Sequence, residues 1–147
     1  MSSTTHGDGA ERGILLVISG PSGVGKTTIT RELQRRYDAV FSVSATTRPR
    51  AADEVDGRDY FFVSEEAFET DVQQGKFLEY AKVFGRYCYG TPREPVERFL
   101  REGRLVILDI DVQGALQVRR SMPDAFMIFI LPPSERELLR RLRDRAR

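Results

Sequence analysis

Residues Ile14 to Thr28 read ILLVISGPSGVGKTT, and this stretch decides the fold. The five aliphatic residues 14–18 form an apolar run of the length expected for a buried strand. The next eight residues, 20–27, fit the phosphate-binding pattern G-x-x-x-x-G-K-S/T without a mismatch. A helical repeat of larger residues follows at Ile29, Leu33 and Tyr37. Strand, glycine-rich loop and helix stand in the order that a phosphate-binding loop requires.

The chemistry of such a loop rests on its backbone N–H groups. Glycines at positions 20, 23 and 25 let the chain curl so that several N–H groups point at one polyphosphate. The following helix adds its positive end, the Lys26 ammonium is expected to reach the terminal phosphates, and the Thr27 hydroxyl is expected to bind Mg²⁺. The predicted phosphate-binding residues are Gly20, Pro21, Ser22, Gly23, Val24, Gly25, Lys26, Thr27 and Thr28. The alternative is a tight turn that matches by chance.

The composition indicates one globular domain with room for an inserted subdomain in 147 residues. A net charge of +1 gives no general attraction to nucleic acid or to an anionic membrane, and no apolar run approaches the ~18 residues of a membrane span. The single cysteine, Cys88, excludes an internal disulfide and indicates a reducing compartment. Residues 1–12 lack the features of a signal peptide and are predicted to form a disordered tail, in which His6 is solvated. We therefore expect a cytoplasmic protein.

Apolar strands separated by helices predict an α/β fold, with a parallel sheet and helices on both of its faces. Strands are expected at 14–18, 105–109 and 125–131, the last of them buried. Residues 41–46 alternate as a further strand, whereas the stretch 47–90 lacks this rhythm. The predicted division is a tail at 1–12, a core at 13–46 and 91–133, a small mixed α/β insert at about 47–90, and the start of a lid at about 134–147.

Helix starts are predicted at three places. Ser64 is the expected N-cap of a helix within the insert. The stretches Thr91–Glu94 and Ser134–Glu137 each fit the capping box, in which the first side chain accepts a hydrogen bond from the backbone N–H three residues later. A short helix is also expected after Gly114.

A phosphate-binding loop needs a carboxylate on the metal side. Asp109, which ends the apolar strand 105–109, is the natural candidate, so Thr27 and Asp109 are the predicted metal ligands. Asp111 follows two residues later. It either points to the same side as Asp109 or caps the next helix.

Seven blocks of the sequence, in order and correctly spaced, resemble the guanylate kinases, which are nucleoside monophosphate kinases that phosphorylate GMP from ATP. The blocks are GPSGVGKTT (20–28), FSVSATTR (41–48), EVDGRDYFFVS (54–64), GKFLEYA (75–81), YGT (89–91), ILDIDVQGALQV (107–118) and PPSERELLRRL (132–142). The resemblance covers residues 13–147. It implies a P-loop kinase fold in which the phosphate loop holds ATP with Mg²⁺ and the insert holds GMP.

The resemblance also implies which residues bind GMP. Arg48 is similar to an arginine that clamps the GMP phosphate, and the hydroxyls of Tyr60 and Tyr89 contact the same phosphate. The implied base-binding residues are Ser44, Glu79, Thr91 and Asp111. A carboxylate accepts both the N1–H and the N2–H₂ donors of guanine, whereas adenine would leave it unpaired. From the residues alone, the two tyrosines have the alternative of being core aromatics of the insert, and Ser44 that of lying on the polar face of a strand.

Phosphoryl transfer to GMP needs cations rather than a general base, because the acceptor phosphate is mostly dianionic at neutral pH. The predicted catalytic residues are Lys26, Arg48, Arg141 and Arg145, of which the last two are similar to lid arginines of the family. Without the resemblance, the arginine-rich end of the chain would be interpreted as a solvated helix face.

This chain departs from the family pattern in three ways, of which the first is a segment at 85–90 that is one residue longer than the family's usual turn. Ala51 stands where the family usually has a second phosphate-clamping arginine, and Arg50 lies one place early, so Arg50 is expected to replace it by a local shift. Family members also continue past the lid, so part of the fold is expected to be missing here. The predicted function is transfer of the γ-phosphoryl group of ATP to GMP or dGMP by a monomer or homodimer that binds neither nucleic acid nor membrane. The alternative is a weak or inactive fragment that binds a nucleotide or a protein.

Overall fold

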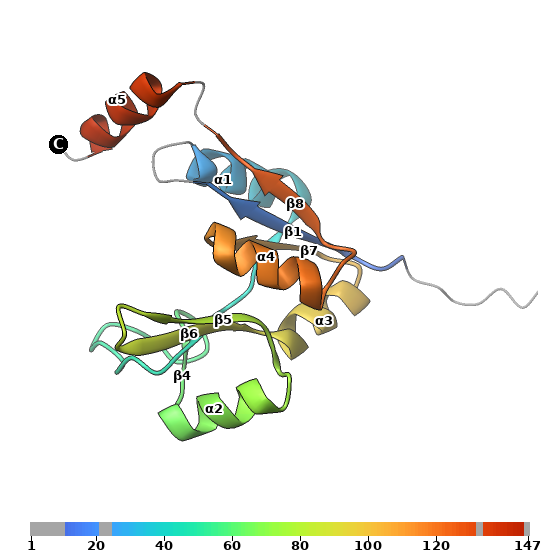
Figure 1. Cartoon of the computed structure of the whole chain (residues 1–147). Helices are drawn as coiled ribbons and strands as arrows, with labels where there is room; N and C mark the ends of the chain where they lie inside the picture. The colour runs from blue at the N-terminus through green and yellow to red at the C-terminus, as the bar shows by residue number, and fades with distance from the viewer. Residues whose placement is uncertain (1–10, 21–24, 132–133, 146–147) are drawn as a thin grey trace, which may run out of the picture.

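The first of the two sheets among the described residues is parallel, as the sequence predicts. The computed structural model describes residues 11–20, 25–131 and 134–145 (Figure 1). The sheet is built from four strands in the order β2-β7-β1-β8, and every pairing in it is parallel. Its strands are β1 (Ile14–Ser19), β2 (Val40–Phe41), β7 (Leu105–Asp109) and β8 (Phe126–Phe129).

Helices cover both faces of this sheet because successive side chains of a strand point to opposite sides. On one face, Leu16 and Ile18 of β1 pack with Leu33 of α1 (Lys26–Tyr37). On the other face, Leu15 and Val17 pack against α3 (Arg93–Arg101) and α4 (Val112–Ser121). The predicted α/β class, with helices on both faces of a parallel sheet, is therefore confirmed.

A second, mixed sheet lies beside the first, with the strand order β4-β3-β6-β5. Its strands are β3 (Ala45–Thr46), β4 (Phe61–Phe62), β5 (Phe77–Val83) and β6 (Tyr87–Pro92). Helix α2 (Glu65–Gln73) begins at Ser64, whose side chain accepts a hydrogen bond from the Ala67 N–H as predicted. Phe68 of α2 stacks on Phe77, with the ring centroids 4.5 Å apart. The sheet spans 45–92, two residues beyond the expected insert at each end.

Two local predictions are wrong. Residues 41–46 are not one strand, because Phe41 pairs with β7 in the first sheet and Ala45 pairs with β6 in the second. The chain passes from one sheet to the other between them. Thr91 does not cap α3, since Pro92 is the N-cap residue and the Thr91 hydroxyl is bonded to Glu79 instead. The Thr91 side chain is thus bonded to a residue distant in the chain instead of to the backbone of α3.

The C-terminal elements agree with the sequence in part. Helix α5 (Glu135–Arg145) begins as predicted, with the Ser134 hydroxyl accepting a hydrogen bond from the Glu137 N–H. Strand β8, however, is not buried: Phe126 is 62% exposed and Phe129 is 48% exposed. Within the described residues β8 pairs with β1 alone, so it forms an edge of the sheet. Across that same described part of the chain, no helix has the length and apolarity to cross a membrane.

Candidate active site

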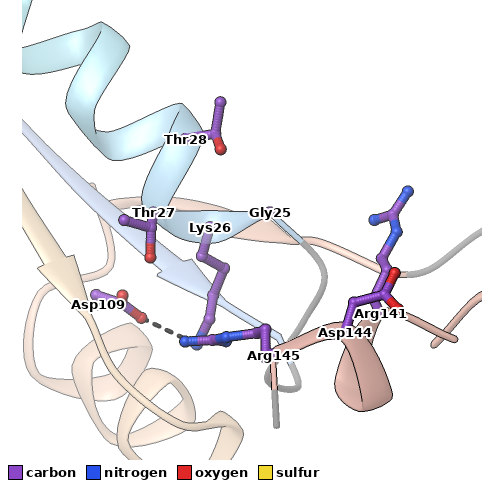
Figure 2. A pocket seen from close by; sticks show the side chains of 8 residues that line it. All are labelled: Gly25, Lys26, Thr27, Thr28, Asp109, Arg141, Asp144 and Arg145. Atoms are coloured by element: carbon purple, nitrogen blue, oxygen red, sulfur yellow. Dashed lines mark ion pairs between the residues drawn. The ribbon is translucent and has the colours of Figure 1, made fainter. Parts of the chain in front are cut away.

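The carboxyl edge of the first sheet brings Lys26 and Asp109 together. Strands β1 and β7 are parallel and in register, with Ile18 beside Asp109, so both end at the same edge. Lys26 is the first residue of α1, and its Nζ lies 3.1 Å from Oδ1 of Asp109 (Figure 2). Gly25 before it has a φ of 94°, a left-handed conformation that favours glycine. Pro21, Ser22, Gly23 and Val24 of the predicted loop lie outside the described residues.

A cavity of about 560 Å³ opens at this ion pair. Besides the pair itself, Gly25, Thr27 and Thr28 line it. Thr27 and Asp109 supply a hydroxyl and a carboxylate oxygen, which are hard donors of the kind that Mg²⁺ prefers. A Mg²⁺ ion that accompanies a nucleotide needs one or two protein oxygens, because phosphates and water complete its coordination. The donor set therefore fits the predicted metal.

Helix α5 closes the far side of the same cavity with Arg141, Asp144 and Arg145. In Figure 2 the Arg145 side chain extends toward the Lys26–Asp109 pair, whereas the Arg141 guanidinium is turned away from it. Arg141 Nε instead donates to Glu137 at 3.0 Å. Hydrogen bonds from Arg140 and then Arg141 lower the pKa of Glu137 to about 2. The arginine-rich helix is thus not only a solvated face, because one side of it borders the cavity.

Arg48 is the centre of a second cluster, in the second sheet and the loop that leaves it. Its guanidinium donates two hydrogen bonds of 2.8 Å to the two carboxylate oxygens of Glu54. It also lies over the ring of Tyr60, 5.2 Å from the centroid, and the Tyr60 and Tyr89 rings meet edge to face at 6.0 Å. The structure therefore brings together the three side chains that the sequence predicted for the GMP phosphate.

Glu54 is a functional candidate that the sequence analysis missed. The hydrogen bonds from Arg48, followed by the one from the Ala51 N–H, lower the pKa of Glu54 to about 2. The same contact raises the pKa of Arg48 above its usual range. Glu54 opens one of the blocks that resemble the family, but locally it is only an acid six residues after the arginine within a charged loop, a spacing that no helical or strand period favours.

Arg50 points elsewhere. Its Nη1 donates to the backbone carbonyl oxygens of Glu54 (2.7 Å) and Ala51 (3.3 Å). Its guanidinium thus braces the loop 51–54.

Glu79 lies half-buried on β5 and is held by β6. The Thr91 hydroxyl donates to its Oε1 at 2.8 Å. Burial raises the pKa of Glu79, and the nearby Asp111 carboxylate adds to that rise, although the bonds from Thr91 oppose it. Among the described residues no cation acts on the pKa of Glu79. A half-buried carboxylate without a cation is costly, which is typical of a site that receives a donor from a ligand.

Asp111 serves as the N-cap of α4, the second of the two roles that the sequence left open. Its Oδ1 accepts a hydrogen bond of 2.7 Å from the Gly114 N–H. The helix accordingly starts at Val112 and includes Gly114, earlier than expected. Ser44 is half-buried at the passage between the sheets, where its carbonyl accepts a bond from the Phe61 N–H.

One short connection joins the cavity of Lys26 and Asp109 to the Glu79 carboxylate. Asp109 faces Lys26 in the cavity, and Asp111 lies close enough to Glu79 to raise its pKa. Only Ile110 separates them in the chain. The carboxyl edge of β7 therefore contributes to both halves of the candidate site.

A parallel sheet whose first strand leads through a glycine-rich segment to a lysine, with an acid at the end of the neighbouring strand, is typical of P-loop nucleotide-binding proteins. The comparisons with known proteins narrow this class. The family model described as guanylate kinase matches residues 12–147, and the chain belongs to that family.

Several proteins named guanylate kinase are similar to this chain. The relative from Clostridium tetani is 52% identical over 132 residues, which are 90% of this chain and 63% of the relative. The one from Thermosynechococcus vestitus is 53% identical over 135 residues, 91% of this chain and 70% of the relative. A crystal structure of guanylate kinase from Anaplasma phagocytophilum is similar at 40% identity and a TM-score of 0.65. The match covers 90% of this chain and 67% of the chain in that crystal structure. The chain thus spans about two thirds of the length of these relatives.

Proposed function

We propose that this chain transfers the γ-phosphoryl group of ATP to GMP or dGMP, giving ADP and GDP. The observation that carries the proposal is the Glu79 carboxylate, half-buried against Thr91 and Asp111 beside the edge that holds Lys26 and Asp109. Guanine offers this acid two donors, N1–H and N2–H₂, whereas adenine presents a lone pair there. A buried polar group left unpaired by the wrong substrate supports strong discrimination.

The proposed catalysis is charge neutralisation and positioning. Lys26 would bind the terminal phosphates of ATP from the start of α1, with the backbone of the glycine-rich loop around them. Arg48, Tyr60 and Tyr89 would bind the GMP phosphate as a group. Arg141 and Arg145 would approach from α5 as the lid. Two anions are thereby brought in line without a general base, because the acceptor phosphate is already ionised.

Mg²⁺ is part of the proposal as a companion of ATP. Thr27 and Asp109 are the residues that would hold it, and when bound it supplies charge neutralisation on the ATP phosphates. Asp109 is shared between Lys26 and this role, so the ion pair holds the carboxylate at the edge of the first sheet before the metal arrives.

The finer parts of the proposal come from the sequence. They are a cytoplasmic location, a monomeric or homodimeric state, no nucleic-acid partner, and two further site residues: Ser44 near the base, and Arg50 as the residue that holds the loop 51–54 beside the GMP phosphate. The single cysteine supports the cytoplasmic location, and the net charge of +1 supports the absence of a nucleic-acid partner. The intact pairing of Lys26 with Asp109 supports an active enzyme rather than a fragment that only binds.

A coupled assay of ADP release tests the proposal, with GMP, dGMP, AMP and no acceptor compared on the same chain. We expect turnover with GMP and dGMP, and at most about a hundredth of that rate with AMP. Equal rates with GMP and AMP would remove the assignment of the base, leaving phosphoryl transfer to an unidentified acceptor.

A further inference from the structure

The outer edge of β5 is covered by a helix rather than by another strand. β5 ends the strand order of the second sheet and pairs with β6 on its inner side. Figure 1 shows α4 running along β5, between that strand and the first sheet. An edge strand presents N–H and C=O groups that need partners when they are covered. The N–H and C=O groups on the outer edge of β5 therefore need partners from α4.

Gln117 meets the edge at Tyr80 as a neighbouring strand would. Its Oε1 accepts a hydrogen bond from the Tyr80 N–H at 3.1 Å, and its Nε2 donates to the Tyr80 carbonyl at 3.0 Å. A side-chain amide carries one acceptor and two donors, so it reproduces the pair of bonds that a peptide group in an adjacent strand makes. The Tyr80 backbone, directly after Glu79, is fixed by both of its polar groups.

Ser121 meets the same edge on the other side of Glu79. Its hydroxyl donates to the Leu78 carbonyl at 2.7 Å and also lies 2.9 Å from the Gln117 carbonyl oxygen. The ladder between β5 and β6 is irregular between Phe77 and Glu79, and such irregularities re-aim side chains near functional sites. The Leu78 backbone, just before Glu79, is thus bonded to α4 at the point where its pairing with β6 is irregular.

Gly114 allows α4 to approach Glu79 itself. A Cβ at this position would lie 3.1 Å from Oε2 of Glu79. Gly114, Gln117 and Ser121 are spaced by three and four residues, so they share one face of the helix. That face contacts the residue before Glu79, the residue after it, and its carboxylate.

We propose that Gln117 and Ser121 are positioning residues for guanine recognition, holding the β5 backbone on both sides of Glu79 so that its carboxylate meets the acceptor base. The inference rests on the proposed function, in which Glu79 reads guanine. Neither residue touches the cavity of Lys26 and Asp109, so the ATP side is unaffected. Small displacements of a recognition group are costly, because its hydrogen bonds depend on distance and direction.

The test is Gln117→Met, which keeps the length and helix propensity of the side chain and removes its amide. Loss of two backbone-fixing bonds should raise the KM for GMP roughly five- to thirtyfold and leave the KM for ATP within about twofold. Hydrogen exchange of the Tyr80 amide should become faster. The matched control is Gln73→Met in α2, an exposed helical glutamine, for which both constants and the Tyr80 exchange should stay at wild-type values.

A KM for GMP within twofold of wild type in Gln117→Met would overturn the proposal, as would an equal rise in the constants for GMP and ATP. If Gln117→Met does not fold, Ser121→Ala removes one bond and is judged by the same criteria, with about a threefold rise expected for GMP. Failure of the proposed function is distinguishable: in that case the wild-type chain itself does not turn over GMP, while the exchange of the Tyr80 amide still reports on the contact.

Discussion

The ATP side and the GMP side of the candidate site hold their cations in different ways. Lys26 meets Asp109 through one contact of 3.1 Å at the edge of the first sheet, next to an open cavity. Arg48 is held by two bonds to Glu54 and lies over the Tyr60 ring, at the second sheet. The cation on the ATP side is thus placed by strand register, and the one on the GMP side by a network of side chains. Substitutions on the ATP side should therefore act mainly on kcat, and substitutions on the GMP side mainly on the KM for GMP.

The largest effect is expected for Lys26→Ala. Removal of the charge that faces the transferred phosphoryl group should lower kcat about a thousandfold, because this charge stabilises the transition state more than the bound substrates. Binding of GMP, measured by calorimetry, should stay within about threefold. Lys82→Ala, at an exposed position of β5, is the control and should leave kcat unchanged. A Lys26→Ala enzyme with wild-type kcat would contradict the assignment of the ATP side.

Glu79→Gln should act on the other side, raising the KM for GMP roughly a hundredfold while ATP binding is retained. Folding should survive, because burial disfavours the charged acid and a neutral amide still accepts the bond from Thr91. Thermal melts within a few degrees of wild type would separate recognition from stability. A large fall in melting temperature with unchanged KM for GMP would make Glu79 a structural residue.

The same carboxylate predicts a pH dependence. Burial raises the pKa of Glu79 above its ordinary value of 4.5, so the acid gains its proton earlier than an exposed glutamate as the pH falls. The protonated acid no longer accepts both donors of guanine, so the KM for GMP should rise as the pH falls through the raised pKa. In Glu79→Gln this component is absent, and the remaining slope comes from the GMP phosphate itself.

The contrast between the two sides also explains what the sequence could predict. Lys26 and Thr27 belong to a contiguous motif whose spacing follows from its geometry, and Asp109 ends a strand that is apolar throughout, so local patterns located them. The ion pair between Lys26 and Asp109 then follows from parallel register. The class of fold was predictable for the same reason, since apolar runs of strand length alternate along the chain with segments of helical period.

On the GMP side, local patterns gave wrong or incomplete answers. Thr91 fits a capping box, yet its hydroxyl is bonded to Glu79, twelve residues away in the chain. Glu54 was missed because its partner is set by a loop conformation. In the first sheet the exposure of β8 was also missed, because an apolar run does not reveal whether a strand lies at the edge of a sheet. Each error concerns a partner that only the tertiary structure supplies.

Glu54→Gln should have a smaller effect than Glu79→Gln, because Glu54 acts through Arg48. Loss of one charged acceptor should loosen the guanidinium and raise the KM for GMP roughly tenfold, with kcat nearly unchanged. The pKa of Glu54 is lowered from 4.5 to about 2, so its stabilising contribution is complete above 4.5 and is lost as the pH falls toward 2. The melting temperatures of variant and wild type should therefore differ at pH 6 and converge near pH 2.

The smallest effect is expected for Arg50→Ala, and it sharpens the contrast within the GMP side. Arg50 is exposed and donates to the carbonyl oxygens of Ala51 and Glu54, so its removal costs surface contacts that are individually weak. The KM for GMP should rise by less than about threefold, against about a hundredfold for Arg48→Ala. A large rise for Arg50→Ala would instead mean that the loop 51–54 rearranges when GMP binds. Arg50 would then reach the phosphate and replace the arginine that the family usually has at the position of Ala51.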